Sequence, residues 1–83
     1  MQRETLHEWL KRRPFQPFRL YLTDGRVFDI RYPRMNLLAK IFIKIGVPEP
    51  NGTDPLICDH TEYVPLAQIT RLEPLSAAQT QGA

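Results

Sequence analysis

Cysteine is nearly absent from the sequence: Cys58 stands alone among 83 residues, and there are only two histidines. One thiol excludes an internal disulfide framework, and His7 and His60 lack the spacing of a zinc site. A chain without disulfides suits a reducing compartment, so the sequence predicts a cytoplasmic protein. We expect Cys58 to behave as a small apolar residue in a strand.

Long hydrophobic runs are also absent. No stretch approaches the roughly 18 apolar residues of a membrane span, and the opening MQRETLHEWLKRR lacks the apolar core of a signal peptide. The sequence therefore predicts a protein that has no contact with a membrane.

Catalytic and ligand-binding motifs are missing as well. There is no glycine-rich phosphate loop, and Ser76 lies in the polar C-terminal stretch. Cys58 and His60 are two residues apart on a predicted strand, where their side chains point in parallel and do not meet as nucleophile and base. Asp24 suits a turn better than a general base. We therefore expect a protein that is not an enzyme, with no cofactor, no metal and no evident small-molecule substrate.

The composition is that of one small globular domain, with 42% hydrophobic and 24% charged residues and a net charge of +2. The charges are unevenly distributed. Ten of the eleven Lys and Arg lie between Arg3 and Lys44, among four acidic residues, whereas Arg71 is the one base after Gly46, among five. Opposite signs in the two halves would suit head-to-tail contacts between copies of the chain.

The strongest local pattern runs from Pro14 to Tyr32, PFQPFRLYLTDGRVFDIRY. Apolar side chains alternate with others from Phe18 to Thr23, and again from Val27 to Tyr32, on either side of Asp24-Gly25. This arrangement predicts a β-hairpin entered through two prolines.

The register of this hairpin follows from the alternation. A two-residue loop would place Leu20 opposite Asp29 and bring charges into the core. A three-residue loop with Gly25 as a left-handed bulge instead places Leu20 opposite Phe28 and Arg19 opposite Asp29. We therefore expect the three-residue loop and a positive φ at Gly25.

Residues 5–13 are predicted to form a short helix that packs on one end of the sheet. Thr5 and Glu8 have the spacing of a capping box, in which each side chain bonds the other residue's backbone amide. Leu6, Trp9 and Leu10 fall on one helix face. We expect Trp9 to fill the core and not to serve as a binding aromatic.

The segment Leu37–Val47, LLAKIFIKIGV, is predicted to be the third strand. A helix of this length is the alternative, which the clustered isoleucines and alternating lysines disfavour. The two faces of the predicted strand are Ala39, Ile41, Ile43 and Ile45 on one side and Lys40, Phe42 and Lys44 on the other.

The remaining segments complete the order of elements. Gly46–Pro55 is rich in proline and turn residues and predicts an exposed loop. Leu56–Val64 predicts a fourth strand, Pro65–Gln68 a single helical turn, and Ile69–Leu72 a short fifth strand that Pro74 ends.

These elements predict an α+β, mainly β fold: a short N-terminal helix and a five-stranded, strongly bent antiparallel sheet or small barrel of the Sm-like or Src-homology type. A closed sheet of this length would hide its edges around one core. We expect one domain over residues 1–75 and a flexible tail over residues 76–83.

The stretch PFQPFRLYLTDGRVFDIRYP resembles a group of small bacterial proteins of unassigned function, in which a short amphipathic helix precedes Pro-Phe repeats and an alternating strand with Asp-Gly. The resemblance covers most of residues 4–75 and implies no activity. That group continues with His-Pro-Glu where this chain has Tyr32, Pro33 and Arg34. The order of elements also resembles Sm-like proteins, from which Ile30 and the stretch YVPLAQITRL depart.

Basic side chains interleaved with aromatics on the outward faces of the first three strands predict a working surface. Such a surface is typical of proteins that stack single-stranded bases and pair their phosphates. Self-association in a homo-oligomer, which stabilises a small core, is the function that we place first. Binding of single-stranded nucleic acid by an RNA-binding regulator of the Sm-like type is the alternative. The residues of the surface are Arg19, Tyr21, Arg31, Lys40, Phe42 and Lys44.

Overall fold

The computed structural model of the chain describes residues 1–52, 54 and 57–75. This part contains one helix and six strands, with two single turns of 3-10 helix. The elements in chain order are α1 (Arg3–Lys11), β1 (Phe18–Leu22), β2 (Val27–Ile30), η1 (Pro33–Met35), β3 (Asn36–Leu38), β4 (Phe42–Pro48), β5 (Cys58–Pro65), η2 (Leu66–Gln68) and β6 (Ile69–Pro74).

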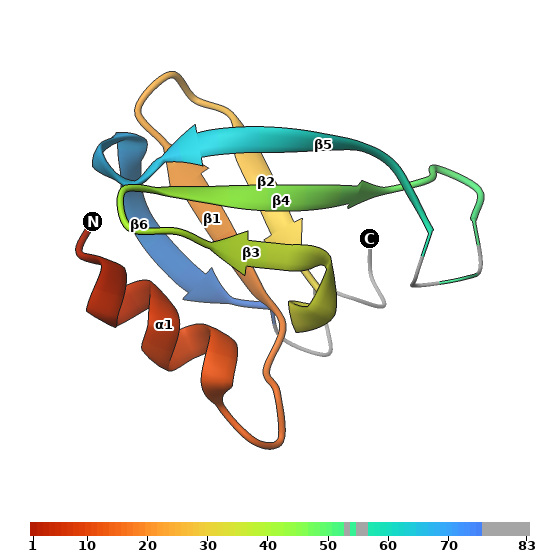
Figure 1. Cartoon of the computed structure of the whole chain (residues 1–83), viewed down its shortest axis with the longest axis horizontal. Coiled ribbons are helices and arrows are strands. Elements are labelled where there is room, and N and C mark those ends of the chain that lie inside the picture. The colour runs from red at the N-terminus through yellow and green to blue at the C-terminus, as the bar shows by residue number, and fades with distance from the viewer. Residues whose placement is uncertain (53, 55–56, 76–83) are drawn as a thin grey trace.

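The strands form two antiparallel sheets of three strands each. The first sheet has the order β2-β1-β6 and the second the order β3-β4-β5. Figure 1 shows the second sheet in front of the first, with the strands of the two sheets crossing and α1 at the lower left. The chain passes from the first sheet to the second through η1 and returns through η2.

The α+β, mainly β class is confirmed, but the closed five-stranded barrel is wrong. Over the described residues there are six strands, and no hydrogen-bonded ladder joins β2 to β3 or β5 to β6. The barrel required one long strand, Leu37–Val47, beside the first hairpin. That segment pairs with itself and with β5 instead, so the second sheet forms separately. The predicted tail, residues 76–83, lies outside the described residues.

The first hairpin has the predicted register. Leu20 lies opposite Phe28, and Arg19 lies opposite Asp29. Gly25 has a φ of 92°, and the amide of Leu22 donates to the carbonyl oxygen of Arg26 at 2.9 Å. The three-residue loop is therefore confirmed, because only this loop puts the apolar residues of both strands on one face.

The segment Leu37–Val47 is a tight hairpin and not the single strand that was predicted. The amide of Ala39 donates to the carbonyl oxygen of Phe42 at 2.8 Å, which closes a turn over Lys40 and Ile41. Leu38 of β3 then lies opposite Ile43 of β4. Because the chain reverses at the turn, Ile41 does not continue the inward row, and it is 73% exposed.

The helix α1 begins two residues before the predicted start, and its N-terminus has no side-chain hydrogen bond. The predicted capping box of Thr5 and Glu8 is therefore wrong: Gln2 holds the N-cap position, and Thr5 lies inside the first turn of the helix. The apolar face is as predicted. Leu6 is fully buried, and Trp9 meets the ring of Phe18 edge to face at 5.2 Å.

The later segments are close to their predicted places. The helical turn Leu66–Gln68 and the strands β5 and β6 are present, with β6 extended to Pro74. Gly46 belongs to β4 and is buried, although it was predicted to open the loop. Cys58 lies in a strand as predicted, but it is exposed.

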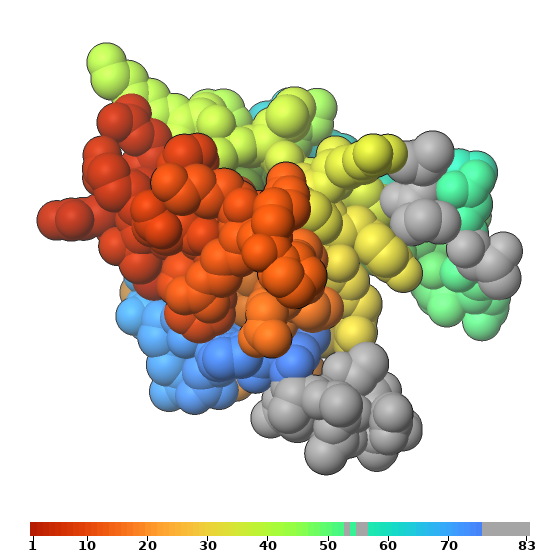
Figure 2. Space-filling model, turned by 90° about the horizontal axis from the view of Figure 1, so that it is seen from below, coloured from red at the N-terminus to blue at the C-terminus, as the bar shows by residue number. Residues whose placement is uncertain are grey.

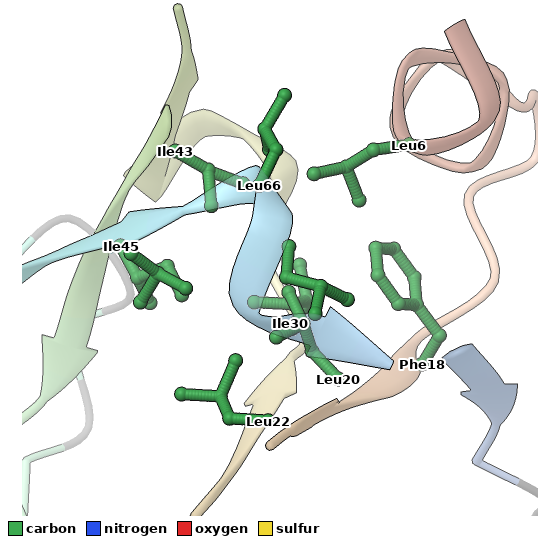
Figure 3. Close-up of a cluster of buried hydrophobic side chains, with 10 residues drawn as sticks. Leu6, Phe18, Leu20, Leu22, Ile30, Ile43, Ile45 and Leu66 are labelled. Carbon is green, nitrogen blue, oxygen red and sulfur yellow. The ribbon is translucent and has the colours of Figure 1, made fainter. Parts of the chain in front are cut away.

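The core lies between the two sheets. Figure 3 shows Leu20, Leu22 and Ile30 pointing from the first sheet toward Ile43 and Ile45 of the second. Burial of each such side chain contributes about 1.5–3 kcal/mol. Since the inner faces meet in this way, the outer faces of the sheets lie on opposite sides of the molecule. The buried hydrophobic residues are Leu6, Phe18, Leu20, Leu22, Ile30, Ile43, Ile45, Val64, Leu66 and Ile69.

Candidate interaction surfaces

The residues of the predicted surface are divided between the two sheets. Three lie on or beside the first sheet and three on or beside the second, so they do not form one continuous face. The physical reason is the hairpin of β3 and β4, which carries its outward side chains to the opposite side of the molecule. On the first sheet lie Arg19, Tyr21 and Arg31, and on the second Lys40, Phe42 and Lys44.

On the first sheet, the two arginines share one carboxylate. Arg19 donates from Nε and Nη2 to the two oxygens of Asp29, at 2.7 and 3.3 Å, and Arg31 approaches the same carboxylate at 3.5 Å. The hydrogen bond to Asp29, together with its charge, raises the pKa of the Arg19 guanidinium. Both cations are thus already paired within the protein.

Tyr21 is also engaged by its neighbours. Its hydroxyl donates to Oε1 of Glu73 at 2.8 Å, and the guanidinium of Arg71 lies 4.0 Å from the centre of its ring. Arg71 pairs in turn with Glu73 at 3.4 Å. Arg71 and Glu73 were not predicted from the sequence, because they reach Tyr21 only through the pairing of β1 with β6, about 50 residues along the chain.

The second sheet presents a set of exposed or half-buried side chains, apolar except for one lysine, which we call the aromatic face. The ring of Phe42 meets the ring of Tyr63 edge to face at 5.5 Å, and Nζ of Lys44 lies 5.7 Å from the ring of Tyr63. Leu37 is 66% exposed and Tyr63 is 62% exposed. The aromatic face consists of Leu37, Ile41, Phe42, Lys44 and Tyr63.

Strand pairing makes the aromatic face continuous. Lys44 lies opposite Leu37 of β3 and opposite Tyr63 of β5, so these three side chains stand in a row across the sheet. Sequence reasoning found Phe42 and Lys44 from the alternation of β4. It missed Leu37 and Tyr63, whose positions depend on the turn and on the β5 register.

Charged side chains lie at the hairpin turn of the second sheet and along β5. Lys40, in the turn after β3, makes no hydrogen bond or ion pair with any other described residue. On the β5 side, His60 lies between Asp59, at 2.8 Å, and Glu62, at 3.1 Å. The bond to Asp59, aided by Glu62, raises the pKa of His60 above its ordinary value of 6.5.

Three hollows accompany these surfaces. One of about 360 Å³ lies between β2 and β4 and includes Asp29 and Arg31. One of about 270 Å³ adjoins the aromatic face at Leu37, Lys44 and Cys58. A third, of about 340 Å³, lies between α1 and the η1-β3 segment, and we call it the basic cleft. The residues that line the basic cleft are His7, Leu10, Lys11, Arg13, Pro33, Arg34, Asn36 and Leu38.

Within the described ranges, no three side chains of His, Cys, Asp or Glu are arranged to hold a metal ion. In the same part of the chain, no helix is long and apolar enough to cross a membrane. In comparisons with known proteins, no family model, no curated protein and no solved structure matches the chain.

Proposed function

We propose that the chain is a non-enzymatic interaction module that self-associates through its aromatic face, with a second copy of the chain as its partner. The observation that carries the proposal is the row of Leu37, Lys44 and Tyr63 across three paired strands, with Phe42 packed on Tyr63. Leu37, Ile41 and Tyr63 are each more than half exposed.

Removal of these apolar side chains from water is the driving force for association. Burying an apolar side chain of this size contributes about 1.5–3 kcal/mol relative to leaving it in water. Monomeric proteins rarely expose contiguous apolar patches larger than a few hundred Å², and larger patches commonly mark interfaces. Lys44 can remain in such a contact because its stem is apolar and its ammonium lies over the ring of Tyr63.

Two-fold symmetry allows a second copy of the chain to cover the aromatic face. In a two-fold dimer whose axis runs parallel to β4, the β3 edge of each copy faces the β5 edge of the other. The row of Leu37, Lys44 and Tyr63 then faces the same row of the other copy in reverse order, as an isologous two-fold interface requires.

A small core gives association a further benefit. The described part of the chain buries ten hydrophobic residues in one cluster. A domain of this size is only marginally stable by itself, and binding of a partner to the folded state alone raises its apparent stability.

Sedimentation equilibrium over a range of protein concentrations tests the proposal. The chain is expected to have twice the mass of one chain at high concentration, and Tyr63→Glu is expected to shift it to the mass of one chain. Val27→Glu is the matched control, because Val27 is an exposed apolar residue, 45% accessible, on the other sheet. The proposal is wrong if the unaltered chain stays monomeric, or if both substitutions dissociate it equally.

The alternative, single-stranded nucleic-acid binding on the predicted surface, has support on the second sheet. There Lys44 stands beside two aromatic rings, as in a stacking platform. On the first sheet, Arg19 and Arg31 are already paired with Asp29, which leaves less positive charge for a phosphate. We therefore keep self-association as the principal proposal.

A further inference from the structure

The basic cleft brings together positive side chains from two distant parts of the chain. Figure 2 shows α1, in red and orange, beside the yellow and yellow-green η1-β3 segment. His7 and Lys11 come from the helix, Arg13 from the chain just after it, and Arg34 from η1. The described residues that line the cleft include no Asp or Glu.

The cations of the cleft are incompletely neutralised. Arg34 makes no hydrogen bond or ion pair with another described residue. Arg13 donates to the carbonyl oxygens of Leu10 and Arg12, at 3.3 and 2.7 Å, and these neutral acceptors leave its charge uncompensated. Lys11 pairs with Glu8 at 3.1 Å in an exposed pair, which solvent weakens. Positive charge is thus available to an anion in the cleft.

Asn36 also lines the cleft. Its side-chain amide donates from Nδ2 to the carbonyl oxygen of Tyr32 at 2.8 Å. Oδ1 of the same amide is buried away from the open space of the cleft, so the cations and the apolar side chains are the groups that a ligand meets.

We propose that the basic cleft binds the phosphate group of a nucleotide, either free or as part of a single strand. The phosphate would contact Arg34, Arg13 and Lys11, since guanidinium groups match phosphate geometry. Leu10, Pro33 and Leu38 supply an apolar wall for the sugar or base, and the volume of about 340 Å³ is within the range of small-ligand sites.

Two-dimensional NMR of the full chain, titrated with AMP, inorganic phosphate and a single-stranded eight-uridine RNA as separate probes, tests this proposal. AMP is expected to shift the signals of His7, Arg34 and Asn36 saturably. The methyl groups of Leu10 and Leu38, which line the cleft, are expected to respond to AMP but not to inorganic phosphate, which lacks the sugar and base. The RNA arm shows whether the strand binds through the same residues, with the salt dependence of phosphate contacts.

Arg34→Gln is the decisive variant, because Arg34 has no partner whose loss would disturb folding. This substitution is expected to weaken the binding of AMP about tenfold, which corresponds to the loss of one charge-assisted hydrogen bond. Lys40→Gln is the matched control, because Lys40 is also unpaired but lies outside the cleft. Tyr63→Glu is expected to retain binding, so the failure of self-association and of this site can be told apart.

The proposal is overturned if neither AMP nor the RNA shifts the cleft signals. It is also overturned if Lys40→Gln weakens binding as much as Arg34→Gln, or if Lys44→Gln alone abolishes it, which would place the nucleotide on the aromatic face. If AMP leaves the methyl signals of Leu10 and Leu38 unchanged, the assignment to a nucleotide is wrong.

Discussion

The backbone oxygen of Met35, in η1, lies directly against Gly46 of β4. A Cβ built on Gly46 would stand 2.7 Å from that oxygen and 3.2 Å from the Cβ of Met35. Gly46 is thus the position at which η1 approaches the second sheet, at the point where the chain crosses between sheets.

Substitution of Gly46 by alanine is therefore expected to destabilise the protein by about 1–3 kcal/mol, as for overpacking of a rigid contact. The oxygen belongs to the backbone, so it can move only if η1 shifts. Urea unfolding measures the change in the free energy of unfolding. Thr61→Ala is the control, because Thr61 lies opposite Gly46 on β5 but is exposed, and it is expected to change little.

Gly25 provides a second test, in which the backbone conformation, and not a steric clash, requires glycine. Nothing lies within 4 Å of a Cβ built there, but the φ of 92° is one that residues with a side chain rarely adopt. Gly25→Ala is therefore expected to cost about 1 kcal/mol of stability, and Gly25→Asn less, because asparagine tolerates this region better. Equal stability of Gly25→Ala and the unaltered chain would contradict the three-residue loop.

The His60 cluster predicts a dependence of stability on pH. The bond to Asp59, with that to Glu62, raises the pKa of folded His60 above 6.5. Because the pKa is raised on folding, the pairing of charged His60 with the carboxylates stabilises the folded state. This stabilisation is fully present below about pH 6.5 and is lost as the pH rises through the pKa of folded His60. The urea midpoint of the unaltered chain is thus expected to fall relative to His60→Gln as the solution becomes alkaline.

NMR titration of the His60 ring gives the direct check, and Asp59→Asn is expected to lower its pKa toward 6.5. If the Asp59→Asn ring titrates at the same pH as the unaltered one, the carboxylate is not the cause. The substitution leaves the backbone of β5 in place, so the comparison isolates the side-chain contact.

The sequence was most informative where structure depends on neighbours along the chain. The first hairpin is an example, because alternation on both sides of Asp24-Gly25 allows only one loop length that keeps charges out of the core. The apolar face of α1, with Leu6 and Trp9, follows from helical spacing alone. Ile43 and Ile45 were also placed correctly, because they lie on the same side of the turn.

Alternation misled the prediction where the chain reverses. Leu37–Val47 alternates without interruption, yet the turn at Lys40 and Ile41 places Leu38 and Ile43 on the same face although they are an odd number of residues apart. A straight strand and a tight hairpin have the same local pattern here. Which of the two forms depends on the strands that pair with β4, and one of these strands is β5, which lies later in the chain.

The candidate sites were predictable only in part, for the same reason. Phe42 and Lys44 follow from one strand, but Tyr63 joins them through the register of β4 with β5. The basic cleft combines α1 with η1, which no local pattern connects.

The sequence by itself determined the turn at Gly25, the apolar helix face and the mainly β class, since each depends on backbone geometry and side-chain order within a few residues. Only the tertiary structure decided the division into two sheets and the composition of their surfaces, because strand pairing and packing act between residues far apart in the chain.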